Sequence, residues 1–308
     1  FIIINLYVFN FMQVTRGQCL AFVLNITGQL PLFACRLLGR LAGLMLWIVP
    51  NKSRRITQVN IALCFPELST AQQRKLVFNS LQHTGMLALE TALIWRKPYR
   101  LLKQYMSTIV NLDLLEAAKV TDRGIVILLP HLGNWEIFSR YMPVEHDLIM
   151  ALYEPPSITE LESLIKTGRE KDGAKLVPTN ARGVSALLKH LRKGGITLIL
   201  PDQVPDLNTN SGVFAPFFKQ TTYTMTLATQ LAQKTNSHIL AATAKRIGSG
   251  FEIKFSKPEA SIYAGDALVA IAAMNRLVEQ CVREMPEQYQ WEYKRFKRQQ
   301  SAGQSPYK

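Results

Sequence analysis

Two segments of the chain share one layout: Gly124-Ile-Val-Ile-Leu-Leu-Pro-His131 and Gly195-Ile-Thr-Leu-Ile-Leu-Pro-Asp202. Each is a short apolar run that follows a glycine, ends at a proline and leads directly into a titratable residue. Short apolar runs with these boundaries are typical of strands that are buried on both faces of a parallel sheet. Open α/β sheets bind ligands beyond the carboxyl ends of their strands, so we predict that His131 and Asp202 lie at one rim of a sheet.

Helices and strands alternate on both sides of these segments. Ser69 or Thr70 is expected to cap the first long helix. The expected strands cover residues 148–152, 238–244 and 251–255, and the expected helices cover residues 69–105, 112–120, 158–167, 184–191 and 268–285. Alternation at this spacing predicts an α/β fold with a mixed, largely parallel sheet that is flanked by helices.

The N-terminal part of the chain predicts a membrane-anchoring helix. Residues 1–12 are almost wholly apolar, residues 19–35 carry no charge, and a further apolar stretch is followed by the basic run Asn51-Lys-Ser-Arg-Arg55. Basic residues next to an apolar segment mark its cytoplasmic side. We therefore expect an anchor over residues 1–55, either spanning the membrane or lying in its interface, and a globular domain over residues 56–308. The alternative is a helix that is buried in the core of a soluble protein.

The composition limits the classes of partner. With 48% hydrophobic and 19% charged residues, the chain is not expected to be disordered. Its net charge of +14 is concentrated in residues 1–121, which contain 13 Lys or Arg residues against 4 Asp or Glu residues. This excess indicates anionic lipid headgroups or an acidic protein partner, while nucleic acid is a weaker alternative because no nucleic-acid-binding module is recognisable. The cysteines form no Cys-x-x-Cys pair, which favours reduced thiols in a cytosol-facing protein over a disulfide framework or a zinc site; they are Cys19, Cys35, Cys64 and Cys281.

The residues after His131 have the composition of a catalytic strand-to-helix junction. Gly133 permits a tight turn, Asn134 is a good helix N-cap, and Glu136 falls in the first helical turn. We expect the carboxylate of Glu136 to orient the ring of His131, as the orienting acid of a catalytic triad does. The spacing alone is weak, since a single histidine is often a structural or surface residue. No Gly-x-Ser-x-Gly elbow or reactive cysteine supplies a nucleophile, so a hydroxyl of the substrate is expected to attack.

Several blocks of the sequence resemble one enzyme family. His131-Leu-Gly-Asn-Trp-Glu136 resembles the His-x4-Asp/Glu signature of the glycerolipid acyltransferase superfamily. A closer resemblance is to the lipid A biosynthesis acyltransferases, the late lauroyl and myristoyl transferases of Gram-negative bacteria. The similar blocks are, in order, Leu200-Pro-Asp-Gln203, Ala215-Pro-Phe-Phe218 and Pro286-Glu-Gln-Tyr-Gln-Trp-Glu-Tyr-Lys-Arg-Phe-Lys297. The resemblance extends from the N-terminal segment to Lys297, with one departure at Tyr293, where the family often has histidine.

This resemblance implies that residues 56–308 form an acyltransferase domain on the cytoplasmic face of the inner membrane. The donor would be an acyl chain on the acidic acyl carrier protein. The acceptor would be the hydroxyl of a 3-hydroxyacyl chain on a lipid A precursor, and membrane lipid would surround the anchor. His131 would remove the hydroxyl proton, and Arg169, which matches a family arginine, would stabilise the oxyanion. A solvated charge at a helix end is the alternative for Arg169, and neither a metal nor an organic cofactor is implied.

Other residues of these blocks have expected roles beside the catalytic pair of His131 and Glu136. Asn134 is expected to position the acceptor, unless it only caps the helix, and Asp202 and Gln203 are expected to support the site. The remaining expectations are an acyl-chain pocket lined by Phe214, Phe217 and Phe218, for which ordinary core packing is the alternative, and contacts with substrate or carrier from Trp291, Lys294 and Arg295.

Other functions remain open on the same sequence features. A glycerol-phosphate or lysophospholipid acyltransferase would use the same scaffold, and a thioester hydrolase would admit water where the lipid hydroxyl is expected. A non-catalytic membrane adaptor would use only the basic surface. Such an adaptor has no need for His131 beside a carboxylate.

Overall fold

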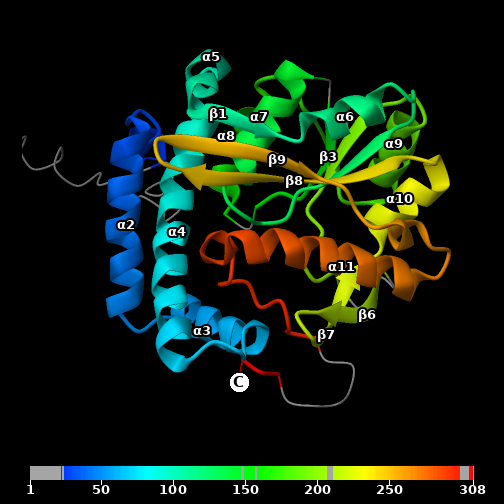
Figure 1. The fold of residues 1–308 in the computed structure, drawn as a ribbon. Helices are drawn as coiled ribbons and strands as arrows, with labels where there is room; N and C mark the ends of the chain where they lie inside the picture. Colours follow the sequence, from blue (N-terminus) through cyan, green and yellow to red (C-terminus); the bar gives the residue numbers. More distant parts are fainter. Residues whose placement is uncertain are drawn as a thin grey trace, which may run out of the picture.

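The computed structural model describes Phe22 and residues 24–146, 149–156, 158–206, 211–298 and 305–307. Within these residues the central sheet has seven strands in the order β1-β9-β8-β2-β5-β3-β4, and β6 and β7 form a separate antiparallel hairpin (Figure 1). The pairs of the central sheet are parallel except for β8 with β9. The strands are β1 (Met106–Val110), β2 (Ile125–Leu128), β3 (Ile149–Tyr153), β4 (Lys175–Pro178), β5 (Ile196–Ile199), β6 (Gly212–Phe217), β7 (Gln220–Met225), β8 (His238–Ile247) and β9 (Gly250–Ser256). The predicted mixed, largely parallel α/β sheet is confirmed.

Helices cover both faces of the sheet. The described α-helices are α2 (Leu32–Ile48), α3 (Lys52–Cys64), α4 (Thr70–Arg96), α5 (Tyr99–Leu102), α6 (Leu112–Lys119), α7 (Trp135–Glu145), α8 (Glu162–Glu170), α9 (Ala181–Leu191), α10 (Leu227–Thr235) and α11 (Ala267–Glu284). Helices α6 and α7 pack on one face, while α9, α10 and α11 pack on the other (Figure 1). Short 3-10 turns cover Lys103–Tyr105, Thr159–Leu161, Ala260–Tyr263 and Pro286–Gln288.

Strand β2 lies at the centre of the sheet, and this position explains why both faces of the strand are apolar. Val126 and Leu128 point into the core under α9, α10 and α11, whereas Ile125 and Ile127 point into the core under α6 and α7. Alternate side chains of a strand face opposite sides, so a strand between two helical layers has to be apolar throughout. The unbroken apolar run before His131 is the sequence signature of this position.

Helix α4 begins as predicted and ends earlier than predicted. The hydroxyl of Ser69 accepts a hydrogen bond from the backbone N–H of Gln72, and the Gln72 side chain accepts one from the backbone N–H of Ser69, which completes a capping box. The expectation of helix through residue 105 is wrong, because Pro98 disfavours the helical conformation at Lys97 and the helix stops at Arg96.

Helices α2 and α4 lie side by side at one end of the sheet (Figure 1). Glycines allow their backbones to meet, since a Cβ atom at Gly85 would lie 2.1 Å from the carbonyl oxygen of Gly39. The opposite side of α2 is not covered by any described residue. Its exposed apolar side chains recur at helical spacing and include Phe33, Leu37, Leu41, Met45 and Ile48.

The predicted anchor is only partly within the described residues. Residues 1–12 and Cys19 lie outside them. Within the described part, no single helix has both the length and the apolar composition for a membrane span, but α2 and α3 meet these criteria together as a pair bent by 83°. The expected boundary at residue 55 falls inside α3.

Candidate active site

The two matching segments of the sequence form neighbouring strands. β2 and β5 pair parallel, with Leu128 opposite Ile199, so each chain leaves the sheet at the same rim. The predicted proximity of His131 and Asp202 is confirmed. The ring Nδ1 of His131 lies 2.8 Å from Oδ1 of Asp202, and the backbone N–H of His131 donates to Oδ2 at 2.9 Å.

The hydrogen bonds of His131 agree on the position of its ring proton. The side-chain amide nitrogen of Gln203 lies 3.1 Å from Nε2 of His131, and an amide nitrogen only donates, so Nε2 accepts. The proton is therefore on Nδ1, which donates to the carboxylate of Asp202. The side chain of His131 is 11% exposed, and the ring of Trp135 contacts it edge to face at 4.8 Å between centroids. The basic nitrogen thus lies on the side of Gln203, which is exposed to solvent.

Asp202 is held ionised in a buried position. Burial opposes its charge, but the charge and hydrogen bonds of His131, followed by the positive charge of Arg295, hold the pKa of this carboxyl below its usual value. Burial and then the charge of Asp202 raise the pKa of the neighbouring Tyr289 hydroxyl well above its usual value. Tyr289 was not among the predicted site residues, although it lies in the C-terminal block of the sequence.

Glu136 lies in the first turn of α7 as predicted, but its carboxylate does not orient His131. It accepts hydrogen bonds from Nε of Arg169 at 3.1 Å, from Nη2 of the same guanidinium, and from the indole N–H of Trp95 at 2.9 Å. Burial alone would raise the pKa of Glu136, but Arg169 and the two nearby indoles outweigh it and lower the pKa. The expectation that Glu136 orients the ring of His131 is therefore corrected, because Asp202 and Gln203 bond the two ring nitrogens.

Arg169 lies at the end of α8 and remains partly accessible. Its side chain is 30% exposed, while the carboxylate that it contacts is almost fully buried. The ion pair joins the start of α7 to the end of α8. The guanidinium is therefore held at a fixed place and still presents part of its surface to solvent.

The loop between β2 and α7 runs closely against β8. Gly133 has a φ of +65°, and a Cβ atom there would lie 2.1 Å from the carbonyl oxygen of Ala244, so no larger residue fits. The next backbone N–H, that of Asn134, donates to the same carbonyl at 2.8 Å. Asn134 precedes the helix as predicted, but its side chain does not cap it. Its amide nitrogen donates instead to Oε2 of Glu90 at 2.9 Å.

Two of the three residues predicted to line an acyl-chain pocket lie in a packed aromatic cluster. Phe217 and Phe218 are each 1% exposed, and their rings contact those of Phe65, Trp291 and Phe296. Phe214 is partly buried on β6 and contacts the ring of Tyr223. This packing favours the alternative of ordinary core packing for Phe217 and Phe218, and the acyl-chain pocket stays a prediction.

Two of the three C-terminal residues that were expected to contact substrate or carrier, Trp291 and Arg295, are buried instead. Trp291 is buried in the same aromatic cluster and donates from its indole N–H to the carbonyl of Pro286 at 2.6 Å. Arg295 is 2% exposed and donates to the hydroxyls of Thr222 and Thr224. Of the three predicted residues, Lys294 alone is exposed.

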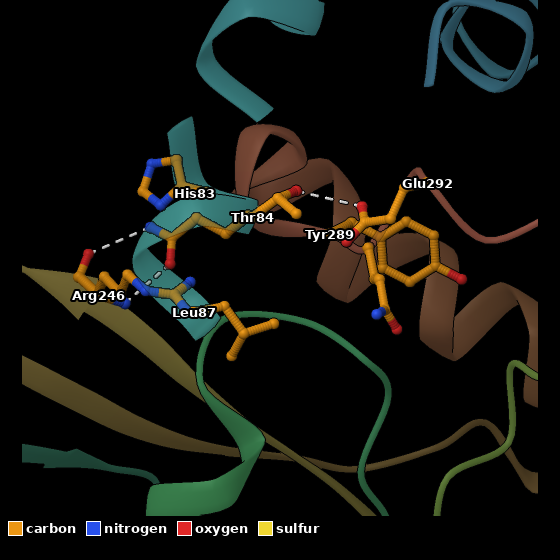
Figure 2. A pocket seen from close by; sticks show the side chains of 8 residues that line it. His83, Thr84, Leu87, Arg246, Tyr289 and Glu292 are labelled. Atoms are coloured by element: carbon orange, nitrogen blue, oxygen red, sulfur yellow. Dashed lines mark hydrogen bonds between the residues drawn. The ribbon is translucent and has the colours of Figure 1, made fainter. Parts of the chain in front are cut away.

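A small cavity lies between α4, β8 and the C-terminal segment of residues 288–292 (Figure 2). Its volume of about 10 Å³ is enough for one water molecule. The Nδ1 atom of His83 and the Nη2 atom of Arg246 have no hydrogen-bond partner among the described residues, and burial followed by nearby arginines lowers the pKa of His83 to about 3. Figure 2 shows the hydrogen bond from Thr84 to the carboxylate of Glu292, whose pKa is raised by burial. The lining residues are His83, Thr84, Leu87, Arg246, Gln288, Tyr289, Gln290 and Glu292.

Comparison with known proteins identifies a family for this chain. Residues 14–298 match the family of bacterial lipid A biosynthesis acyltransferases. The chain is 27% identical to a lipid A biosynthesis lauroyltransferase of Escherichia coli K12, over 89% of each chain, and 29% identical to a lipid A biosynthesis palmitoleoyltransferase of the same organism, over 87% of each. It is 24% identical to a lipid A biosynthesis myristoyltransferase of that organism, over 88% of this chain and 82% of the relative. The chain is therefore an acyltransferase and belongs to the bacterial lipid A biosynthesis acyltransferase family.

Proposed function

We propose that this enzyme transfers an acyl chain from acyl carrier protein to the hydroxyl of a 3-hydroxyacyl chain on a lipid A precursor, with His131 as the general base. The observation that carries the proposal is the hydrogen bonding of the ring. Asp202 holds the proton on Nδ1 and leaves Nε2 as the acceptor on the side of Gln203. A general base needs a nitrogen that can accept the proton it removes, within hydrogen-bond reach of that proton, and Nε2 already accepts from Gln203 at this position.

The reaction then needs no covalent enzyme intermediate. Nε2 of His131 takes the proton of the acceptor hydroxyl as its oxygen attacks the thioester carbonyl. The tetrahedral intermediate collapses with cleavage of the carbon–sulfur bond, and the imidazolium returns the proton to the departing thiol. The cysteines within the described residues do not suit a nucleophilic role, because burial raises the pKa of Cys35 to about 11 and that of Cys281 to about 12, and raises that of Cys64 well above its usual value.

Asp202 stabilises the imidazolium that forms during this step. Its carboxylate is buried, ionised and in direct contact with Nδ1, so positive charge on the ring is favoured as the hydroxyl proton arrives. Gln203 and Asn134 do not act as bases. Gln203 lies where the acceptor hydroxyl would approach Nε2, and its amide would move aside or bond that hydroxyl.

Glu136 contributes through Arg169 in this mechanism. A thioester oxygen becomes negatively charged in the transition state, and a guanidinium of fixed position is suited to stabilise it. Glu136, which also accepts from the indole of Trp95, bonds the guanidinium of Arg169, and the Arg169 side chain remains 30% exposed and so available to substrate. The predicted role of Arg169 as an oxyanion or substrate group thus stays a proposal, supported by this arrangement.

The exposed apolar face of α2 supports placement at the cytoplasmic face of the inner membrane. Phe33 is 74% exposed, and further apolar side chains follow at helical spacing up to Ile48. Trp47, near the C-terminal end of α2, packs partly buried against the core, and the guanidinium groups of Arg54 and Arg74 lie 4.7 and 5.5 Å from its ring. An exposed apolar helix face with arginines near one end fits the boundary between lipid tails and anionic headgroups.

A transfer assay with defined partners tests the proposal. The full chain is incubated in detergent with radiolabelled acyl-acyl carrier protein and a lipid A precursor, and the acylated lipid is resolved by chromatography. We expect acylation of the precursor, little release of free fatty acid without acceptor, and neither product with His131→Ala. Equal transfer to glycerol phosphate or a lysophospholipid, or rapid hydrolysis without acceptor, would instead support the alternative enzymes.

A further inference from the structure

The carboxylate of Glu90 lies at the meeting point of three parts of the fold. Glu90 is in the C-terminal third of α4, and its side chain is 0% exposed. Its Oε1 atom accepts from Nε of Arg36 in α2 at 2.7 Å, and its Oε2 atom accepts from Nε of Arg246 in β8 at 2.6 Å. Oε2 also accepts from the side-chain amide of Asn134 at 2.9 Å. A buried carboxylate is stable only with partners of this kind, so its position is tightly determined.

Arg36 joins this carboxylate to a second element. Its other guanidinium nitrogens donate to the carbonyl oxygens of Ile247 at 3.0 Å and Gly250 at 2.7 Å, which flank the turn between β8 and β9. The guanidinium also lies over the ring of Phe251, at 5.0 Å from its centroid. Through this one side chain, α2 is docked on both α4 and the end of the sheet.

Asn134 joins the same carboxylate to the catalytic loop. A carboxylate can only accept, so the amide nitrogen of Asn134 has to face Glu90, and this determines the orientation of the amide. The backbone N–H of Asn134 donates to Ala244 on β8, the strand that also carries Arg246. His131 precedes Asn134 by three residues and Glu136 follows it by two. The loop between these two residues is therefore attached to Glu90 by its central side chain.

We propose that Glu90 is a positioning residue for acyl transfer, which holds the loop of His131 through Asn134 and makes the order of that loop depend on the docking of α2 through Arg36. This inference rests on the proposed function for its kinetic consequence. Glu90 does not bond the ring of His131, whose two nitrogens bond Asp202 and Gln203. It acts by keeping the loop in the one conformation in which Nδ1 of His131 meets Asp202.

Three variants of the full chain in detergent test the proposal: Glu90→Gln, Asn134→Ala and the double variant. Asn134→Ala leaves the ion pairs of Glu90 intact and so tests the loop attachment even where Glu90→Gln folds poorly. We expect each single variant to lower kcat by about 10- to 100-fold, as small misplacements of catalytic groups do, with both KM values within about twofold of wild type. The double variant should be no slower than the slower single variant, because both changes break one attachment.

Hydrogen exchange provides a readout that does not require activity. We expect faster amide exchange in the peptide over residues 131–137 for Glu90→Gln, for Asn134→Ala and for Arg36→Gln. Ile271→Ala, which opens a cavity beside α11, is the control for a general loss of stability. In this variant residues 131–137 should exchange at the wild-type rate. A wild-type chain without transferase activity would refute the proposed function while leaving this test of Glu90 intact.

The opposite results are equally definite. Wild-type kcat in Asn134→Ala, or losses that multiply in the double variant, would show that Glu90 does not act through Asn134. Unchanged loop exchange in Arg36→Gln would show that the loop does not depend on α2. Loop exchange that increases as much in Ile271→Ala as in Glu90→Gln would reduce Glu90 to a contributor to general stability.

Discussion

Replacing Asp202 by asparagine should inactivate the enzyme while leaving its shape almost unchanged. The carboxylate of Asp202 accepts from two groups of His131, the backbone N–H at 2.9 Å and Nδ1 at 2.8 Å. An asparagine has one accepting oxygen and one donating nitrogen. The backbone N–H can only donate, so the oxygen has to face it, and the amide nitrogen then faces Nδ1. This arrangement forces Nδ1 to accept and moves the ring proton to Nε2, where it blocks proton abstraction.

The expected loss of kcat has two sources: the lost carboxylate charge of Asp202 and the changed tautomer of His131. A carboxylate about 4 Å from the centre of an imidazolium contributes about 4 kcal/mol at an effective dielectric constant of 20. Loss of this stabilisation in the transition state corresponds to about 10³-fold in kcat, and the wrong tautomer adds to it, so we expect a loss of about 10³- to 10⁴-fold. Tyr289→Phe, the matched control, removes one neutral hydroxyl beside Asp202 and should cost about 10-fold or less.

Two measurements decide this prediction. Steady-state transfer at saturating donor and acceptor gives kcat, and ¹⁵N NMR of labelled histidine reports which nitrogen of His131 carries the proton. Asp202→Asn should show the proton on Nε2 and wild-type shows it on Nδ1. A variant with kcat within tenfold of wild type, or with the proton still on Nδ1, would refute the assignment of Asp202 as the residue that orients the base.

Three further perturbations test other parts of the structure. Glu136→Gln should lower kcat by about 10²-fold, because Arg169 is then held less firmly, and should leave the tautomer of His131 unchanged in the NMR measurement. A changed tautomer would show that Glu136 does contact the ring of His131. Burial lowers the pKa of His83 from 6.5 to about 3, so between these pH values the unfolded chain binds a proton that the folded state excludes. The free energy of unfolding should therefore fall by about 1.4 kcal/mol per pH unit as the pH drops from 6.5 toward 3. Denaturant titrations of His83→Leu should lack this pH dependence. Phe33→Ser with Leu37→Ser removes apolar area from the exposed face of α2 and should shift the protein from sedimented anionic vesicles to the supernatant, and unchanged sedimentation would argue against this face as the membrane contact.

The sequence was sufficient to predict the central strands and the rim of the site. β2 and β5 are buried along their whole length because helices cover both of their faces. Their largely apolar sequences, in which Thr197 of β5 is the one polar residue, are visible without coordinates. The edge strands β1 and β4 were not predicted, since Met106–Val110 is largely exposed and Lys175–Pro178 is half polar and ends in proline. The hairpin of β6 and β7 was missed because Pro216 lies within its first strand, and proline argues against a strand in a sequence pattern.

Side-chain partners were harder to predict than strands. Asp202 carried a signal, because it follows a strand with the same layout as that of His131. Glu90 and Trp95 carried none, since each lies inside a long helix with no local motif. Their partners come from distant parts of the chain: Arg36, Asn134 and Arg246 for Glu90, and Glu136 for Trp95. The contact expected between His131 and Glu136 was inferred from their spacing. The same spacing is equally compatible with two side chains that point in different directions from the junction of β2 and α7.

The three buried carboxylates explain how such a junction is held. Asp202, Glu136 and Glu90 are each 4% exposed or less, and each contacts a different functional part: the ring of His131, the guanidinium of Arg169, and the loop side chain of Asn134. Buried ion pairs add little net stability because desolvation offsets most of their attraction, so three of them around one short loop are poorly explained as a means of stabilising the fold. They are better explained by geometry, since a buried carboxylate with all of its partners in place permits only one arrangement of the groups that it binds. The signature of His131 and Glu136 then marks a junction that carries two separately anchored groups: the ring of His131, which Asp202 holds, and the guanidinium of Arg169, which Glu136 holds.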